Sequence, residues 1–365
     1  MRKLEDTQSY KLSFKGENVY IGLDVHLKQW HICVRTRHIS KKPFSQPADA
    51  GALRAYLDRE FPEATYHSAY ECGFSGFSAH RELLKHGIDN IVFHAADISD
   101  SQKERMRKTD AVDCVKICRN LMEGGLTAIF VPDETVESHR ELLSQRNRLV
   151  TARTRLKNRL KSSLHRHGIG YPEEFKSATR HWSRAFLGWM EEEVAPRLAP
   201  VSGDIMLDNI SELRHVSDLV KKADRDILTK LLPRYKEMDG LIRSIPGIGR
   251  LNSAAICAYV VDINRFESDD HLAGYVGLVP DVRASDDKKT TLGITVRGNR
   301  MLRSLLIESA WRAVALDPAM GMVFTNYKKR GLKSNNAIIR IARKLVNRIR
   351  YVLRTGNKYE NGILK

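Results

Sequence analysis

Four carboxylates in three separate places of the chain could together hold metal ions. Asp24 ends the apolar run YIGLD, Glu71 closes a second run in ATYHSAYE, and Asp110 and Asp113 stand three apart in KTDAVD. Residues three apart on a helix point the same way, so this last pair can reach one site. Mg²⁺ prefers oxygen ligands, and two such ions serve phosphodiester cleavage. The quartet therefore predicts a two-metal site for phosphate chemistry.

Each carboxylate alone also has an ordinary structural explanation. Asp110, for example, would suit the start of a helix. An aspartate at the end of an apolar strand, such as Asp24, is costly unless it pairs or binds a cation. The order of a strand Asp, a strand-end Glu and a helical DxxD pair is what favours the metal site over four unrelated residues.

The charge of the chain favours a polyanionic partner. Its 365 residues contain 61 Lys and Arg against 44 Asp and Glu, a net charge of +17. Such a balance indicates nucleic acid, because neutralised phosphates release counterions, with an acidic membrane surface as the alternative. No apolar stretch approaches the roughly 20 residues of a membrane span, and the N-terminus lacks an apolar signal core. We expect a cytoplasmic protein that does not enter a membrane.

The cysteines predict packing and not metal binding. None of the five forms a CxxC pair, and no Cys and His set has zinc-finger spacing. We expect all five to be reduced and mostly packed, as buried cysteines usually are.

The first part of the chain predicts an α/β domain. Apolar runs and turn signals indicate strands over 18–25, 30–37, 64–71, 90–96 and 128–132, and helices over 51–60, 77–87 and 110–124. Strands that are first paired and then alternate with helices are typical of an α/β fold. We place this domain at residues 1–135.

The middle part, residues 136–240, predicts a helical coiled-coil or oligomerisation region. Within 134–168, leucines recur near heptad spacing at positions 142, 149, 156, 160 and 164. From Arg146 to His167 the segment is rich in basic residues and has no acidic one. A second helical pattern covers 207–240 and is interrupted by Pro233. The two helices could pair as an antiparallel coiled coil or serve as a dimer arm, and the irregular segment 171–203 suggests no role.

The C-terminal part, residues 241–365, predicts a mainly helical domain. IPGIG at 245–249 lies between two helical patterns, and Gly247 and Gly249 would expose backbone N–H groups that bind phosphate in a helix-hairpin-helix-like turn. An ordinary tight connection is the alternative. Further along, an apolar stripe at helical spacing is formed by Ile338, Ile341, Leu345, Ile349 and Val352. The opposite face of this helix is basic and carries Arg340, Arg343, Lys344 and Arg348. This basic face favours nucleic-acid contact over an ordinary solvated surface.

A polar segment of this C-terminal part, DVRASDDKKTTLG at 281–293, reads as a loop that carries hydroxyl groups. A serine that attacks a phosphodiester needs cations to hold the phosphoryl oxygens. Ser285 has several basic residues near it in sequence that could do so: Arg283, Lys288, Lys289, Arg297, Arg300 and Arg303. Thr290 and Thr291 are equally available hydroxyls, and the residues alone leave the choice open.

Nearly the whole chain resembles transposases of the insertion sequence 110 family, the DEDD-type, bridge-RNA-guided recombinases. The resemblance rests on the order of six blocks: GLDVH, ECG, KTDAVD, IPGIG, RFESDDHLAGYVGLVP and TVRGNRMLR. In one departure, Asp286 follows Ser285, where the family usually has glycine, and places negative charge beside the hydroxyl.

The resemblance implies a RuvC-like, RNase H-like first domain, a helical coiled-coil middle and a helical transposase domain. It implies that Asp24, Glu71, Asp110 and Asp113 hold two Mg²⁺ ions, with Mn²⁺ as an alternative. It makes Ser285 a nucleophile that becomes covalently linked to DNA. It also implies donor and target DNA as substrates, a structured bridge RNA as guide, and a homodimer or homotetramer in which the metal site of one subunit meets the serine of another. The expected location is the cytoplasm of a bacterium or archaeon, at the nucleoid during activity.

The sequence thus predicts a Mg²⁺-dependent DNA transposase or recombinase with a phosphoserine intermediate. One alternative is a RuvC-like, structure-specific nuclease that uses water and needs no serine. The other is a basic nucleic-acid-binding protein without enzyme activity.

Overall fold

The computed structural model describes residues 13–95, 98, 110–285, 288–295 and 298–360, but not the side chains at 110, 111 and 281–292. The chain forms two compact units, Met1–Pro132 and Asp133–Lys365. The predicted further division at residue 240 stays a prediction.

The first unit is built on a five-stranded sheet in the order β3-β2-β1-β4-β5. β1 pairs antiparallel with β2 and parallel with β4, and β4 pairs parallel with β5. The strands are β1 (Asn18–Val25), β2 (Gln29–Arg35), β3 (Phe44–Pro47), β4 (Thr65–Glu71) and β5 (Asp89–Phe93). The predicted α/β class is confirmed.

Two sets of helices cover the two faces of the sheet. One face packs on α1 (Ala50–Glu60) and α2 (Ser78–Lys85), and its core holds Val19, Ile21 and Leu23 from β1. The other face packs on α4 (Asp110–Met122) through Cys33, Ala69 and Phe93. Because side chains alternate along a strand, the even-numbered residues of β1 and the odd-numbered residues of β4 point toward α4.

A close backbone contact fixes α4 on the sheet. A Cβ atom on Gly22 would lie 2.1 Å from the carbonyl oxygen of Cys114 and 2.4 Å from the amide nitrogen of Cys118. One turn further along α4, the Cys118 thiol donates a hydrogen bond to the Tyr20 carbonyl at 3.2 Å. The helix therefore runs antiparallel to β1, and only glycine fits where the two backbones meet.

One predicted strand of this unit was wrong, and one strand was missed. Residues 128–132 form no strand; a single bridge joins Ala128 to Phe93, and Ile129 donates a hydrogen bond to the Val92 carbonyl. β3, which pairs with β2, was missed, since four residues with an alternating half-exposed pattern give little signal. Both differences lie at the two edges of the sheet: β3 is one edge strand, and Ala128 bridges to β5, the other edge strand.

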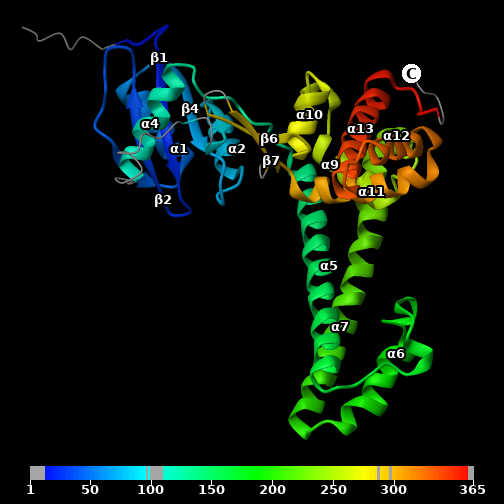
Figure 1. The fold of residues 1–365 in the computed structure, drawn as a ribbon. Coiled ribbons are helices and arrows are strands. Elements are labelled where there is room, and N and C mark those ends of the chain that lie inside the picture. The colour runs from blue at the N-terminus through cyan, green and yellow to red at the C-terminus, as the bar shows by residue number, and fades with distance from the viewer. Residues whose placement is uncertain (1–12, 96–97, 99–109, 286–287, 296–297, 361–365) are drawn as a thin grey trace, which may run out of the picture. The chain divides into compact units, whose positions relative to one another are not determined.

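The second unit begins with a long antiparallel pair of helices, α5 (Glu134–Arg166) and α7 (Pro200–Asp226), seen as the long green pair in Figure 1. Arg146 contacts Asp224 at 2.6 Å, and Arg159 contacts Asn209 at 2.8 Å, which sets the antiparallel register. Three of the predicted heptad leucines, at 156, 160 and 164, are buried against α7. The two predicted helices therefore pair within one chain.

A helical core completes the second unit. After a π-helical turn (Ile227–Leu231) and a 3-10 turn (Leu232–Tyr235), where Pro233 removes a donor, follow α8 (Lys236–Ile242), α9 (Arg250–Val260), α10 (Asp269–Val276), α11 (Arg300–Leu316), α12 (Pro318–Lys329) and α13 (Ser334–Thr355). The predicted apolar stripe of α13 is buried in this core. No helix in the described parts of the chain combines the length and the apolar character that a membrane crossing needs.

The segment predicted as a polar loop is a β-hairpin. β6 (Pro280–Ser285) pairs antiparallel with β7 (Lys288–Ile294), and Ser285 lies opposite Lys288 at the end of the ladder. The β-branched residues Val282, Thr290, Thr291 and Ile294 suit a strand, whereas the charges between them suggested a loop.

We expect Gly22→Ala to lower the free energy of unfolding of the first unit by about 3 kcal/mol, because its methyl group would overlap the α4 backbone. Hydrogen exchange of β1 and α4 peptides during urea unfolding measures this change. Gly73→Ala is the control, since nothing lies within 4 Å of a Cβ there. Equal protection from hydrogen exchange in the Gly22 and Gly73 variants would show that the α4 backbone does not contact β1 closely at Gly22.

Candidate active site

Asp24 and Glu71 lie at the same end and on the same face of the sheet. Leu23 of β1 pairs in parallel register with Tyr70 of β4, so Asp24 and Glu71 are the next residues of adjacent strands. The alternation of side chains turns both toward α4. The Asp24 side chain is 25% exposed, and Glu71 is exposed. Two strand-end carboxylates thus share an open edge.

The first turn of α4 extends over that edge. Cys114 lies on Gly22, and α4 runs antiparallel to β1. Four residues of helix back from Cys114 rise about 6 Å, close to the span of the two strand residues from Gly22 to Asp24. Asp110, the first residue of α4, therefore belongs by its backbone position to the end of β1 that carries Asp24. Asp113, which precedes Cys114, is half-buried.

The sequence reasoning missed two histidines beside Asp24. The Nε2 atom of His26 lies 3.2 Å from Asp24 Oδ2, and His31 is the cross-strand partner of Asp24. His31 Nδ1 in turn lies 3.0 Å from Ser45 Oγ on β3. This contact holds the Asp24 carboxylate against the turn that follows β1. Since the short turn between β1 and β2 and the strand register bring these groups together, only the hairpin geometry could have revealed them.

Three cysteines pack beneath this edge. Cys33 of β2 contacts Cys114 and Cys118 of α4, and all five cysteines of the chain are free, as predicted. Burial, with added effects of Cys33 and Asp24, raises the pKa of Cys114 to about 12, so that thiol stays protonated at neutral pH. The hydrogen bond with Cys118 lowers the pKa of Cys33 to about 7.

The metal site itself stays a prediction. Among the side chains that the structure describes, no three His, Cys, Asp or Glu residues form a set that could hold a metal ion. The side chain of Asp110 lies outside that description. The donor chemistry fits a hard divalent cation, because all four predicted ligands are carboxylates and three elements bring their backbones to one edge.

The predicted nucleophile lies at the tip of the β6–β7 hairpin. By backbone pairing, Thr290 is opposite Arg283, and Thr291 is opposite Val282, two and three residues from Ser285. The side chains of Ser285, Arg283, Lys288, Lys289, Thr290 and Thr291 lie outside the description, and so do residues 286–287 and Arg297. The choice among the three hydroxyls therefore stays open.

The two glycines of the IPGIG turn differ in what they do. Gly247 has φ of +92°, and a Cβ there would lie 2.5 Å from the Ser309 carbonyl of α11. Gly249 caps α9, is exposed and has nothing within 4 Å of a Cβ. Gly247 therefore packs the turn on α11. Of the two glycines, Gly249 is the one at the start of α9, where no side chain caps the first N–H groups.

The first turn of α11 carries the last two predicted phosphate contacts. Arg300 is exposed, whereas Arg303 is half-buried. Burial lowers the pKa of the Arg303 guanidinium, and the positive charge of Arg300 adds to that effect. Of the two, Arg300 is the one open to a nucleic-acid ligand.

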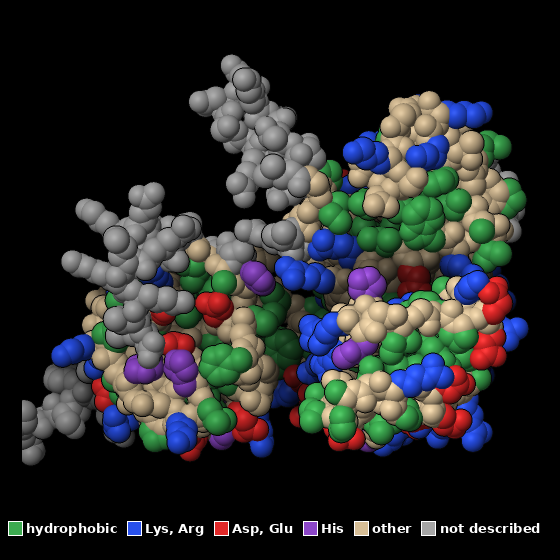
Figure 2. All heavy atoms as spheres, turned by 60° about the horizontal axis from the view of Figure 1, so that its bottom comes forward, with side chains coloured by type: hydrophobic (Ala, Val, Ile, Leu, Met, Phe, Trp, Pro, Cys, Tyr) green, Lys and Arg blue, Asp and Glu red, His purple; other side chains and the backbone are tan. Residues whose placement is uncertain are grey.

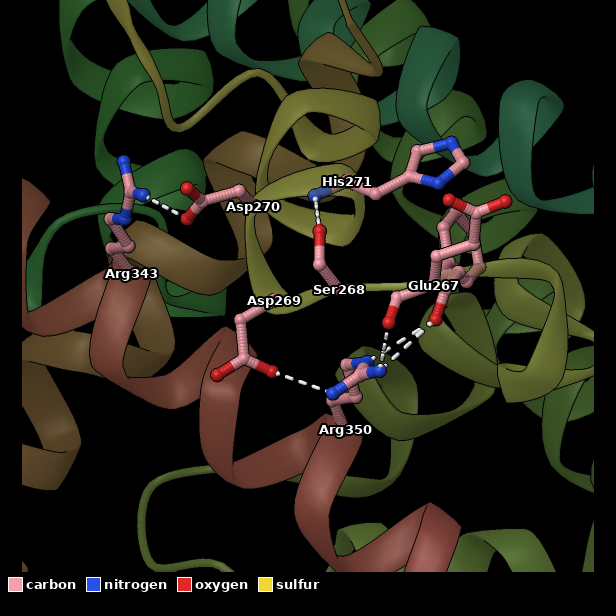
Figure 3. Close-up of polar contacts among 8 residues, drawn as sticks. Glu267, Ser268, Asp269, Asp270, His271, Arg343 and Arg350 are labelled. Atoms are coloured by element: carbon pink, nitrogen blue, oxygen red, sulfur yellow. Dashed lines mark hydrogen bonds and ion pairs between the residues drawn. The ribbon is translucent and has the colours of Figure 1, made fainter.

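The block RFESDDH anchors α10 to α13 (Figure 3). Ser268 caps α10 by accepting a hydrogen bond from the His271 amide at 3.1 Å. Arg350 donates to Asp269 at 3.1 Å and to the Glu267 carbonyl at 2.6 Å, and Arg343 pairs with Asp270. These acidic residues neutralise part of the basic face of α13.

Two further arginines of α13 also have partners within the unit. The Arg340 guanidinium lies over the Tyr327 ring at 5.3 Å, and that of Arg348 lies over the Tyr359 ring at 5.0 Å. With Arg343 paired as well, only Lys344 of the predicted four has no such partner among the described residues. The basic face of α13 is therefore largely structural.

Comparison with known proteins matches both halves of the chain to one transposase family. The model described as "Transposase IS116/IS110/IS902 family" matches residues 239–323, and the transposase model DEDD_Tnp_IS110 matches residues 21–169. The chain belongs to the IS110 family of transposases. The first match spans the IPGIG turn and Ser285, and the second spans all four carboxylates.

Several curated proteins are similar over part of their length. "Putative transposase y4qE" of Sinorhizobium fredii is 27% identical over 268 residues, 73% of this chain and 63% of that protein. "Transposase for insertion sequence element IS1111A" of Coxiella burnetii is 32% identical over 50% of this chain and 48% of its own length. "Pilin gene-inverting protein" of Moraxella bovis is 29% identical over 43% of this chain and 49% of its own length. The chain thus spans about half to two thirds of these relatives.

We expect Gly247→Ala to destabilise the second unit by about 3 kcal/mol, because it combines a strained positive φ with a clash against α11. Gly249→Ala should cost less, about 0.5 to 1 kcal/mol, because alanine is a poorer N-cap than glycine but meets no clash there. Thermal unfolding of both variants by circular dichroism provides the comparison. A similar cost at the two positions would contradict the assignment of Gly247 to packing.

Proposed function

We propose that this protein is a DNA transposase or recombinase that cuts and rejoins DNA strands. The observation that carries the proposal is the placement of Asp24 and Glu71 on adjacent strand ends, under the first turn of the helix that bears Asp110 and Asp113. Membership of the IS110 family and the net charge of +17 support DNA as the substrate.

Asp24, Glu71, Asp110 and Asp113 would hold two divalent cations, Mg²⁺ or Mn²⁺. When bound there, such ions orient a scissile phosphate and stabilise negative charge on its oxygens. The protein contributes the position of the carboxylates: Gly22 lets α4 approach the sheet, and the strand register fixes the other pair. The hydrogen-bond distance from His26 to Asp24 supports a carboxylate that is held in one orientation.

Ser285 would supply the nucleophile at the same phosphate. Its hydroxyl loses a proton and its Oγ forms a bond to phosphorus, while the bond from phosphorus to a deoxyribose oxygen breaks and that oxygen takes up a proton. The phosphoserine bond keeps the energy of the broken phosphodiester, so the strand can be rejoined without another energy source. The hairpin position of Ser285 supports the role, because residue 285 is the last of β6 and lies opposite Lys288 at the end of the two-stranded ladder.

The remaining parts of the proposal follow from the family. A structured bridge RNA would pair with donor and target DNA, and the carboxylates of one subunit would meet the serine of another in a homodimer or homotetramer. The Moraxella bovis relative, named as a pilin gene-inverting protein, supports recombination as well as transposition within this range of similar proteins.

We expect Asp24→Asn and Glu71→Gln to reduce metal-dependent strand cleavage at least about a hundredfold, as losing a directly acting group typically does. Neither should unfold the protein, because both side chains lie at an open edge of the sheet. Cleavage of supercoiled DNA with and without Mg²⁺ measures the effect. Glu82→Gln is the control, since Glu82 is exposed and contacts only Lys85 in the described chain. Cleavage at the normal rate by Asp24→Asn would remove the metal-site assignment.

We expect Ser285→Ala to abolish the covalent protein–DNA adduct and strand rejoining while DNA binding persists. Thr290→Val and Thr291→Val are matched controls on the facing strand. Denaturing electrophoresis of labelled DNA detects the adduct. An adduct that survives in Ser285→Ala and disappears in one threonine variant would reassign the nucleophile. Cleavage without an adduct in the unaltered protein would instead favour a water-dependent nuclease.

A further inference from the structure

The free end of the α5–α7 pair carries a cluster of positive charge that the proposed chemistry does not use. Residues 170–198 fold back on this end and build an aromatic core from Phe175, Phe186 and Trp189. This segment lies outside both stretches that match the transposase family. Figure 2 turns this end forward and shows Lys and Arg side chains next to hydrophobic ones on it.

Three basic side chains of α5 share one face beside this core. Arg153, Lys157 and Lys161 follow one another at a spacing of one helical turn. The ammonium groups of Lys157 and Lys161 lie 5.2 Å and 5.7 Å from the centre of the Trp182 ring. Both distances are within the range of a cation–π interaction, so Trp182 gathers the two charges above one ring.

No carboxylate within ion-pair distance balances this trio among the described residues. Elsewhere on the same helix, Arg146 pairs with Asp224 and Arg159 pairs with Glu212. From Arg146 to Arg166, α5 itself contains no acidic residue. The trio is therefore a local excess of positive charge on a helix where Arg146 and Arg159 have acidic partners.

The cluster costs the free protein stability. Partial burial lowers the pKa of Lys157, and the charges of Arg153 and Lys161 lower it further. A group whose charged form is disfavoured in this way is stabilised when an anion binds next to it. A bound anion would offset both the cost of partly burying the Lys157 ammonium group and the repulsion from Arg153 and Lys161.

The backbone beside the trio is also held in an unusual conformation. Trp182 has φ of +70°, a region that bulky residues rarely adopt. Its ring packs edge-on against Phe186 at 5.5 Å, which fixes the ring under the lysines. Strain of this kind persists only where the surroundings impose it, and it often accompanies a binding site.

We propose that Arg153, Lys157 and Lys161, gathered on Trp182, form a second nucleic-acid site that binds sugar–phosphate backbone through residues other than the catalytic ones. The proposal rests on the proposed function for its ligand class, because a DNA recombinase brings nucleic acid to this surface. Point charges along one helix suit phosphate groups and carry no sequence preference.

The test compares Lys157→Gln/Lys161→Gln with Lys221→Gln/Lys230→Gln. The second pair removes the same charge from exposed lysines that already contact Asp218 and Asp226. Binding of a mixed-sequence DNA duplex, and separately of an RNA hairpin, is measured over a range of salt in buffer without divalent cations. The slope of log K against log salt should fall by about 0.9 per lysine for duplex DNA in the first pair only. Circular dichroism checks that both proteins fold.

A reduced slope with DNA, with RNA or with both supports the site and identifies its ligand. Equal slopes in the two double variants overturn the proposal. It is also overturned if the two lysine substitutions weaken the binding of polyglutamate but leave the binding of nucleic acid unchanged. Cleavage by each variant, at DNA concentrations that saturate it, separates the two proposals. A failure of the catalytic proposal would remove cleavage chemistry without changing these slopes.

Discussion

The contact between Gly22 and the backbone of Cys114 is the constraint on which the candidate active site depends. A Cβ atom at position 22 would lie 2.1 Å from the carbonyl oxygen of Cys114, so only glycine allows α4 to lie so close to β1. This approach, and the antiparallel direction that the Cys118–Tyr20 hydrogen bond fixes, carry the helical aspartates to the strand ends. A shift of α4 by one turn would separate DxxD from Asp24 while leaving every secondary-structure element intact. The glycine of GLDVH is therefore as much part of the site as the aspartate.

The sequence predicted those parts of the fold that periodicity and burial dictate. Strands with a fully buried face, such as β1 and β4, and long helices with an apolar stripe, such as α5 and α13, follow from side-chain alternation and helical spacing. The hairpin at 280–294 was missed because its stability comes from cross-strand pairing between charged and polar residues, which resembles a loop in one dimension. His26 and His31 were missed for a related reason, since a strand register brings His31 to Asp24.

Charge shows where sequence reasoning reaches its limit. Arg343 and Lys157 look alike along the chain, as basic residues on amphipathic helices. In three dimensions, Asp270 on α10 neutralises Arg343. Among the described residues, the neighbours given for Lys157 are the Trp182 ring and the like charges of Arg153 and Lys161. A helical pattern fixes which residues share a face, but the partner of that face comes from another element. Net charge therefore identifies the kind of ligand and leaves its location undetermined.

The same comparison narrows where nucleic acid can bind the second unit. Arginines that hold the core together, such as Arg350 with Asp269 and two carbonyl groups, cannot turn to phosphate without leaving those groups unpaired, which is costly for half-buried partners. Among the described residues, basic groups without an acidic partner include the α5 trio, Arg300 on α11 and Lys344 on α13. Of these, the α5 trio is the only one in which an aromatic ring and a lowered lysine pKa coincide among the described residues. Under the proposed function, a phosphate contact made by residues that take no part in the reaction stabilises the complex with DNA without hindering the exchange of strands.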